Sequence, residues 1–176
     1  MSKTIIAIDI GKKGAICIYR PSGYPYHEFH PMPMIKDSLD YTKLLSILTP
    51  NNAESTDTTL VIFEKLGVIF GTSKATAFSM GHQCGAIEAM CIALGLQYYM
   101  VGAKVWQKEM FQGTNLITKK SKSGKTSVTD TKATALVVVK QLFPKQKLTF
   151  GEKATKPHDG LVDALLIAEF AVRKNL

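Results

Sequence analysis

The sequence predicts an α/β fold in which a mixed β-sheet is flanked by helices. Residues 4–10 are rich in isoleucine and hardly alternate, which is typical of a strand buried on both faces. Two short segments that follow turns predict a three-stranded antiparallel meander. A further apolar segment, 60–64, comes after a helical crossover, which is typical of a strand parallel to the first. At 176 residues the chain fits a single domain, 1–176.

The strands of the meander are separated by turns that contain glycine. Residues 11–14 predict a tight turn, after which residues 15–19 return as the antiparallel partner of the first strand. The next turn lies at 21–23, and residues 24–30 predict an edge strand with Pro25 near its start.

A helix and a fourth strand follow the meander. Ser38 or Asp40 is a suitable N-cap for a helix that ends near Leu48. The apolar residues expected on one side of this helix are Leu39, Leu44, Leu45 and Leu48. A polar loop over 51–58 then leads to the strand that ends in Glu64.

The remaining chain predicts four helices and a fifth strand. In order, the expected elements are a helix over 73–94, a strand over 96–101, a short helix through Trp106 to about Phe111, a helix capped by Thr129 or Asp130 that ends before Pro144, and a final helix with Pro157 in its first turn. The segment 113–129 has no apolar period, so we expect it to be mobile.

The charge of the chain indicates an anionic partner, most often nucleic acid. The formal net charge is +8, and residues 104–132 hold seven lysines against Glu109 and Asp130. No apolar run reaches the roughly 18 residues of a membrane span. The N-terminal residues enter the first strand directly, so we expect no leader, no membrane partner and a cytoplasmic protein. The three cysteines lie in apolar segments without metal spacing and predict free thiols.

Four carboxylates stand at the ends of apolar elements. Asp9 and Glu64 each close a buried strand, and Asp159 and Asp163 lie one turn apart at the start of the last helix. A buried carboxylate takes up a proton or binds a cation, and clustered carboxylates repel one another. Oxygen ligands suit Mg²⁺ or Mn²⁺, and four of them suggest two ions that act together in phosphodiester hydrolysis. His158 is a candidate metal ligand, general acid or base, or capping residue.

Each acid also has a simpler explanation. Asp159 and Asp163 suit a helix N-terminus because of the helix dipole. Asp9 suits the turn before Gly11, and Glu64 suits an ion pair with Lys65. These explanations are weaker jointly, because three separate segments would each have to end an apolar element in an acid by chance.

Several residues are candidates for contact with DNA. Lysines of the mobile segment suit a phosphate-tracking arm, those near Trp106 and at the start of the 130–143 helix suit the scissile phosphate, and Phe70 suits stacking on a base at an opened duplex. The full candidate set is Lys12, Lys13, Phe70, Lys104, Lys108, Lys119, Lys120, Lys122, Lys125 and Lys132. The alternatives are solvated lysines and a core phenylalanine.

The helix over 73–94 predicts a homodimer contact. Between Ala75 and Gly95 the only acid or base apart from His82 is Glu88, so the helix is apolar nearly all round. Ala77, Gly81 and Gly85 are spaced four apart and allow another backbone to approach closely. The alternative is burial of this second face under the chain's own loops.

This order of elements and acids resembles the RuvC-type Holliday junction resolvases of the ribonuclease-H-like superfamily, and the phage-encoded branch looks closest. The resemblance covers nearly the whole chain, and its carriers are Ile8-Asp9-Ile10-Gly11, Phe63-Glu64-Lys65, Phe78-Ser79-Met80-Gly81, Trp106-Gln107-Lys108 and residues 163–169. It implies a five-stranded sheet ordered 3-2-1-4-5 with strand 2 antiparallel. It also implies a homodimer in the cytoplasm, that of the host if phage-encoded, with two Mg²⁺ or Mn²⁺ ions and paired nicks across a four-way DNA junction.

The last two acids depart from the bacterial pattern. Bacterial members of the family typically space them three apart, but here the residue three before Asp163 is Gly160, and the acid is Asp159. This four-residue spacing looks more like that of the mitochondrial resolvases.

Two other functions fit parts of the same pattern. One is a junction-binding protein that does not cleave. The other is an actin-like phosphotransferase or ATPase, since residues 8–14 also resemble the first phosphate loop of that related fold. Those proteins need a second lobe to close over nucleotide, so the length of the chain argues against a nucleotide cofactor.

Overall fold

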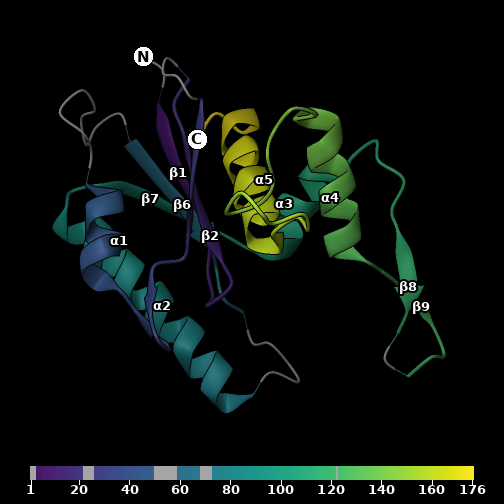
Figure 1. Ribbon diagram of the computed structural model, residues 1–176, viewed down its shortest axis with the longest axis horizontal. Helices are drawn as coiled ribbons and strands as arrows, with labels where there is room; N and C mark the ends of the chain where they lie inside the picture. The colour runs from purple at the N-terminus through teal and green to yellow at the C-terminus, as the bar shows by residue number, and fades with distance from the viewer. Residues whose placement is uncertain (1–2, 22–25, 50–58, 68–72, 122) are drawn as a thin grey trace.

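The computed structural model describes residues 3–21, 26–49, 59–67, 73–121 and 123–176. Its centre is a five-stranded sheet with the order β3-β2-β1-β6-β7 (Figure 1). These strands are β1 (Thr4–Asp9), β2 (Ala15–Tyr19), β3 (His27–Pro31), β6 (Thr59–Glu64) and β7 (Gln97–Val101). The strand β2 is antiparallel to β1 and β3, and β6 and β7 run parallel to β1. Counting only these five strands, the order is 3-2-1-4-5, as predicted.

Helices cover both faces of the sheet (Figure 1). On one face lie α1 (Tyr41–Leu48) and α2 (Lys74–Ala93), and on the other α3 (Ala103–Met110), α4 (Thr131–Leu142) and α5 (Asp159–Arg173). Alternate residues of the strands point to opposite faces of the sheet and join two separate hydrophobic clusters. Ile5 and Ala7 join the core under α5, whereas Ile6 and Ile8 join the core under α1 and α2. This two-sided burial explains why the first strand is apolar throughout.

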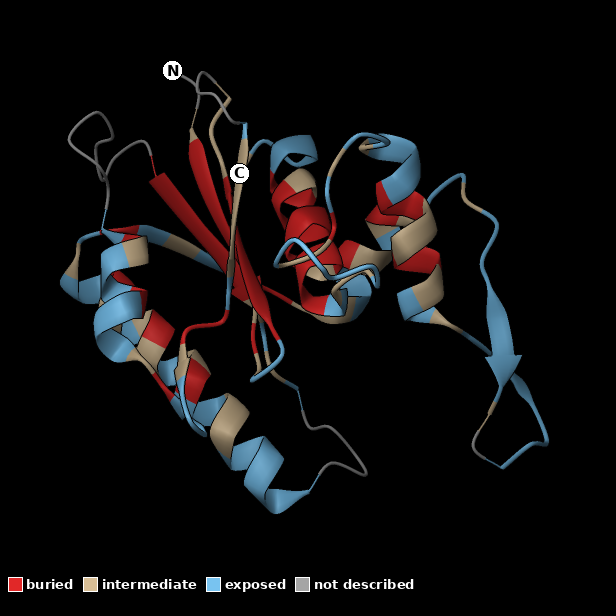
Figure 2. Cartoon of the chain, in the orientation of Figure 1, coloured by how far each residue is buried: buried red, intermediate tan, exposed pale blue. Residues whose placement is uncertain are grey.

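The helix α5 is the most deeply buried helix and lies against β1 and β2 (Figure 2). Ten of its fifteen residues are buried. Because α3 and α4 also pack on it, its first turn is held in a fixed position beside the ends of the strands. No helix among the described residues is long and apolar enough to cross a membrane.

Some boundaries differ from the expectations. The third strand begins at His27 rather than residue 24, and Pro25 lies outside the described residues, as does the 51–58 loop. A small hairpin, β4 (Met34–Ile35) with β5 (Ser38–Leu39), precedes α1 and was not predicted. Asp40 caps α1, as expected. Leu45 was wrongly expected on the apolar side, since it lies on the exposed side of the helix.

The segment 113–129 contains a hairpin, whereas the sequence predicted no regular structure there. The strands β8 (Thr118–Lys120) and β9 (Ser127–Thr129) pair antiparallel and project from the body (Figure 1). Gly124, at φ 71°, lies in the connection between them. Every residue of both strands is exposed. The hairpin has no buried face, so it leaves no apolar period in the sequence.

The helices after this hairpin begin at charged or polar caps. Asp130 accepts a hydrogen bond from the Ala133 backbone N–H and caps α4. The last helix begins at Asp159 with His158 as its N-cap, so the expectation that Pro157 lies in its first turn was wrong. The thiols of Cys17, Cys84 and Cys91 are free, as predicted.

Candidate functional site

Asp9 and Glu64 lie side by side at one end of the sheet. The parallel register pairs Ile8 with Phe63, so the next residue on each strand is one of the two acids. Each acid ends its strand and is less buried than the residues before it. The predicted proximity of these two carboxylates is confirmed.

The first turn of α5 reaches Asp9 because residue 160 has no side chain. A Cβ atom on Gly160 would lie 2.5 Å from the Lys13 carbonyl oxygen, 2.8 Å from the Gly14 Cα and 2.9 Å from Asp9 Oδ2. No side chain fits there, so an acid cannot stand three residues before Asp163 in this packing. The four-residue spacing to Asp159 therefore follows from the close approach of α5 to the turn after β1.

The sequence analysis noted Gly160 only because it stands where bacterial members of the family have an acid. A glycine in the first turns of a buried helix lowers helix stability, and this already suggests a close contact. What the sequence did not reveal is that the contact is with Asp9 and the 11–14 turn.

Burial raises the pKa of three of the acids, and repulsion by the other acids adds to the rise for Asp9 and Asp163. The pKa of Asp9 rises to about 8, first because of burial, then because of Asp163 and Glu64. The pKa of Asp163 rises to about 7 through burial and the charge of Glu64. Burial also raises the pKa of Glu64. The acids thus lie close enough to oppose one another's ionisation, as a cation-binding cluster requires.

Trp106 holds Glu64 in place. The indole Nε1–H donates a hydrogen bond of 2.8 Å to Glu64 Oε1, and the Trp106 side chain is fully buried in α3. This hydrogen bond opposes the rise in the pKa of Glu64. Sequence reasoning identified Trp106 as part of a motif but not as the partner of Glu64.

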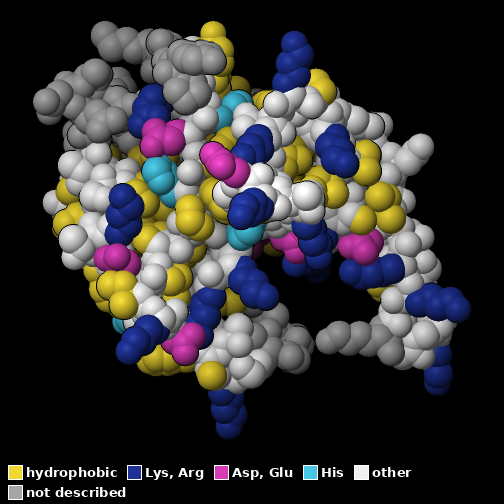
Figure 3. Space-filling view, in the orientation of Figure 1, with side chains coloured by type: hydrophobic (Ala, Val, Ile, Leu, Met, Phe, Trp, Pro, Cys, Tyr) yellow, Lys and Arg dark blue, Asp and Glu magenta, His cyan; other side chains and the backbone are white. Residues whose placement is uncertain are grey.

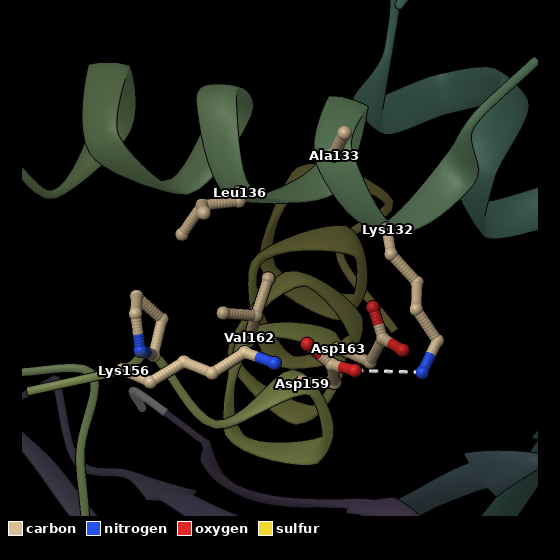
Figure 4. A pocket seen from close by; sticks show the side chains of 8 residues that line it. Lys132, Ala133, Leu136, Lys156, Asp159, Val162 and Asp163 are labelled. Atoms are coloured by element: carbon tan, nitrogen blue, oxygen red, sulfur yellow. Dashed lines mark hydrogen bonds and ion pairs between the residues drawn. The ribbon is translucent and has the colours of Figure 1, made fainter. Parts of the chain in front are cut away.

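Lys132 forms an ion pair with one of the acids. Its Nζ lies 2.6 Å from Asp159 Oδ2, and it reaches the acids from the first turn of α4 (Figure 4). The hydrogen bond to Asp159 raises the pKa of Lys132, and the charges of Asp159, Asp163 and Asp9 act in the same direction. The sequence predicted that Lys132 contacts a phosphate, and this role stays a prediction, since the described contact of Lys132 is with Asp159.

His158 serves as the N-cap of α5. Its Nδ1 accepts a hydrogen bond of 3.2 Å from the Leu161 backbone N–H, and its ring meets the edge of Phe150. This is one of the three roles predicted for it. Metal binding by His158 stays a prediction.

An open cavity of about 530 Å³ joins these groups. Asp9, Asp159 and Asp163 line it, together with the 11–14 turn and His158. Lys13, Lys132 and Lys156 also border it, so basic and acidic side chains face the same space. Lys156 was not among the predicted site residues, because an exposed lysine in a polar connection carries no sequence signal.

The donor chemistry fits a hard divalent cation, since all four acids offer carboxylate oxygens. Within the described residues, no three His, Cys, Asp or Glu side chains are arranged as ligands of one ion. Glu64 and Asp159 instead meet Trp106 and Lys132. The predicted pair of Mg²⁺ or Mn²⁺ ions therefore stays a prediction.

The other candidate DNA contacts fall into three places. Lys119, Lys120 and Lys125 belong to the β8–β9 hairpin and its connection, and Lys119 also pairs with Asp130 at 3.2 Å. Lys104 and Lys108 border a separate hollow of about 430 Å³ beside α3. Lys12 pairs with Asp37 at 2.9 Å. Phe70 and Lys122 lie outside the described residues.

The predicted dimer residues share an exposed row on α2. Ala77, Gly81 and Gly85 are all exposed. A Cβ atom on either glycine would meet no described atom within 4 Å. Close burial of this row under the described parts of the same chain is therefore excluded, and the dimer contact stays a prediction.

Comparisons with known proteins show what the fold is similar to. No family model matches the chain, and no curated protein sequence does. The structure of Thermus thermophilus RuvC is similar, with a TM-score of 0.55 and 16% identity over 98% of this chain and 96% of that one. T. thermophilus RuvC in complex with Holliday junction substrate gives a TM-score of 0.55 and 15% identity over 97% and 96%. At this identity the likeness shows a shared RuvC-type, ribonuclease-H-like fold.

Proposed function

We propose that the chain is a metal-dependent endodeoxyribonuclease that resolves four-way (Holliday) or other branched DNA junctions by paired nicks. The observation that carries this proposal is the cluster of Asp9, Glu64, Asp159 and Asp163 at one end of the sheet. Burial, and then repulsion within the cluster, raise the pKa values of Asp9 and Asp163. Such a cluster favours binding of divalent cations, which relieve the repulsion.

The four acids would hold two Mg²⁺ or Mn²⁺ ions, which when bound supply activation of water and stabilisation of the leaving oxygen. Trp106 fixes the orientation of Glu64 through its hydrogen bond. Lys13, Lys132 and Lys156 border the cavity and would neutralise the phosphates of the bound strand. Asp9 and Asp163 hold protons near neutral pH without a cation, so cation binding would release protons.

The charge of the molecule supports a nucleic-acid substrate. The net charge is +8, and Figure 3 shows lysine and arginine side chains on the β8–β9 hairpin and on the body next to it. A protein of the same fold is described in complex with Holliday junction substrate, which supports a branched duplex for this chain. Assignment to the phage-encoded branch, and a homodimer that places two sites on one junction, belong to the same proposal.

Cleavage of a synthetic four-way junction tests the proposal. We expect symmetric nicks in Mg²⁺, at least a hundredfold loss of rate in Asp9→Asn, and unchanged junction binding by that variant in Ca²⁺. Glu152→Gln is the matched control, since Glu152 is an exposed acid outside the site. Flap and Y-shaped DNA show how far the selectivity extends. Absence of nicking at every salt concentration, or full activity of Asp9→Asn, would contradict the proposal.

The pairing of Lys132 with Asp159 favours a second candidate, a junction-binding protein that does not cleave. A lysine held on one of the four acids disfavours binding of a cation there. The two candidates differ in one experiment. The second predicts tight junction binding in Ca²⁺ and no product in either Mg²⁺ or Mn²⁺.

A further inference from the structure

A hollow of about 430 Å³ lies on the surface between α3 and the base of the β8–β9 hairpin. Lys104, Lys108 and Phe111 border it from α3 and the C-cap of that helix. Leu116 and Thr129 border it from the chain that enters and leaves the hairpin. None of the four clustered acids lines it. The hollow is therefore a feature that the proposed cleavage chemistry does not use.

Both walls of the hollow are fixed by the fold. Trp106 anchors α3, since its side chain is fully buried. On the other wall, the Ile117 backbone N–H donates a hydrogen bond of 3.1 Å to Thr134 Oγ1 of α4. The Ile117 carbonyl oxygen accepts a hydrogen bond of 2.7 Å from the Asp130 backbone N–H. Leu116, next to Ile117, is thus held beside α4, and a ligand would meet walls that need little further ordering.

Phe111 and Leu116 give the hollow an apolar part. Leu116 is 51% exposed. Phe111 is partly buried, and its ring makes an edge contact with Trp106 at 6.3 Å between the ring centroids. A recessed aromatic ring beside an exposed aliphatic side chain is typical of a surface that receives an apolar group of a ligand.

The charged side chains around the hollow are all of one sign. Lys104 and Lys108 lie one turn apart on α3, and no acid is among the described residues that line the hollow. Glu109, the acid of α3, instead pairs with Lys174 at 2.6 Å. A ligand of this hollow should therefore carry negative charge next to its apolar group.

Two glutamines favour a protein ligand over DNA. Gln107 and Gln112 also line the hollow, and each side-chain amide offers both a hydrogen-bond donor and an acceptor. A peptide backbone presents N–H and C=O groups that match both, whereas the phosphates of DNA only accept. The apolar pair, Phe111 and Leu116, also offers nothing to a sugar–phosphate backbone. These features together suit an acidic peptide.

We propose that the hollow is a docking site for an acidic segment of a partner protein, which places a leucine or phenylalanine side chain against Phe111 and Leu116. Its carboxylates pair with Lys104 and Lys108, and its backbone meets the two glutamines. This inference goes beyond the proposed function and does not depend on cleavage. The first turn of α4 borders both the hollow and the larger cavity, so a docked partner would adjoin the candidate active site.

Two peptide libraries of equal length test this inference against the intact protein. Both carry a central phenylalanine or leucine. The flanking positions are drawn from Asp, Glu, Gly and Ser in one library, and from Lys, Arg, Gly and Ser in the other. We expect the immobilised protein to enrich peptides from the acidic library alone. In fluorescence anisotropy, replacement of the central residue of an enriched peptide by alanine should weaken binding at least about tenfold, because the burial of that side chain is lost.

Leu116→Ser tests the apolar part of the hollow. It should weaken binding of the enriched peptides about tenfold, because it removes one of the two apolar side chains. Val105→Ser is the matched control, since Val105 is 56% exposed on α3 but does not line the hollow. Its peptide affinity should stay within twofold of the wild type. Both changes are at exposed positions, and circular dichroism checks that each variant is folded.

Lys104→Gln/Lys108→Gln tests the charges. This double variant should weaken peptide binding about fivefold and make it less dependent on salt, because exposed ion pairs contribute modestly and are screened. Lys140→Gln/Lys145→Gln removes the same charge outside the hollow and should leave both quantities unchanged.

The inference is overturned if the acidic library is not enriched, or if the affinity of enriched peptides is unchanged in Leu116→Ser or in Lys104→Gln/Lys108→Gln. The rival occupant is a duplex arm of DNA, which predicts weaker junction binding in Ca²⁺ for the double lysine variant and no peptide binding at all. Because the readout is peptide binding, a protein that cleaves no junction can still confirm the docking site, and one that cleaves can still refute it.

Discussion

Asp9 is the residue at which folding and the candidate chemistry oppose each other most directly. Its carboxylate is largely buried beside two other acids, and its pKa rises to about 8 from an ordinary value of 3.8. Between these values the folded protein holds a proton that the unfolded chain releases. The free energy of unfolding therefore falls as the pH rises through this window, and Asp163 adds to the fall up to about pH 7.

The expected result is a thermal stability that decreases with pH in the absence of divalent cations. In EDTA, the Tm of the wild type should be several degrees lower at pH 8 than at pH 5. Asp9→Asn should weaken this dependence and have the higher Tm at pH 8, because it removes the ionising group. Thermal unfolding followed by circular dichroism measures both. Glu152→Gln should retain the wild-type slope, and an Asp9→Asn slope as steep as that of the wild type would refute the explanation.

For single residues, the sequence predicted where the acids lie but not which side chains they contact. Asp9 and Glu64 were placed together correctly, because parallel strands that end in acids bring them to one edge. The contacts Trp106–Glu64 and Lys132–Asp159 join residues 42 and 27 positions apart. Such contacts depend on how helices pack over the sheet, which no local pattern encodes.

The β8–β9 hairpin is the element that most changes the sequence-based interpretation. Its role in contacting phosphates stays a prediction, but its backbone is paired rather than irregular. Lys120 and Lys125 are exposed on it, whereas Lys119 is engaged with Asp130, the cap of α4. A hairpin pre-orders its lysines and so lowers the entropy lost when they meet DNA.

The hairpin lysines should therefore contribute to the salt dependence of junction binding. Each lysine that contacts a phosphate adds about 0.9 to the slope of log affinity against log salt. The double variant Lys120→Gln/Lys125→Gln should lower the slope by up to about 2 and weaken binding equally for all junction sequences. Lys140→Gln/Lys145→Gln removes the same charge from exposed positions outside the hairpin and serves as the control. Equal slopes for the two double variants would leave the hairpin without this role.

Elements with a buried face were predicted well. The five sheet strands, α2 and α4 carry apolar patterns that packing enforces, and their expected positions were close to those observed. The β4–β5 and β8–β9 hairpins were not predicted, because they lack a buried apolar face. Their short strands bury little surface, so turn geometry and backbone pairing determine them, and apolar periodicity does not.

For the whole molecule, the exposed row of α2 is the surface that the sequence predicts to form a dimer contact. Ala77, Gly81 and Gly85 line it, and Phe78 beside them is 76% exposed. Small residues let a second helix approach closely, and an exposed aromatic side chain adds apolar area to the contact. Paired nicks need two sites, and a two-fold homodimer would supply them with one self-complementary surface.

The variant Gly81→Leu tests the dimer contact without disturbing the fold of the protomer. A Cβ atom at residue 81 meets no described atom within 4 Å, so leucine should fit within the protomer, and replacement of glycine should stabilise the helix by roughly 0.8–1 kcal/mol. The same side chain would block close approach of a partner helix. We expect sedimentation to give the mass of one chain, an undiminished Tm for that monomer, and single nicks in place of paired ones. Gly81→Ala, which adds only a methyl group, should remain largely dimeric, and a Gly81→Leu mass equal to that of the wild type would contradict the dimer contact.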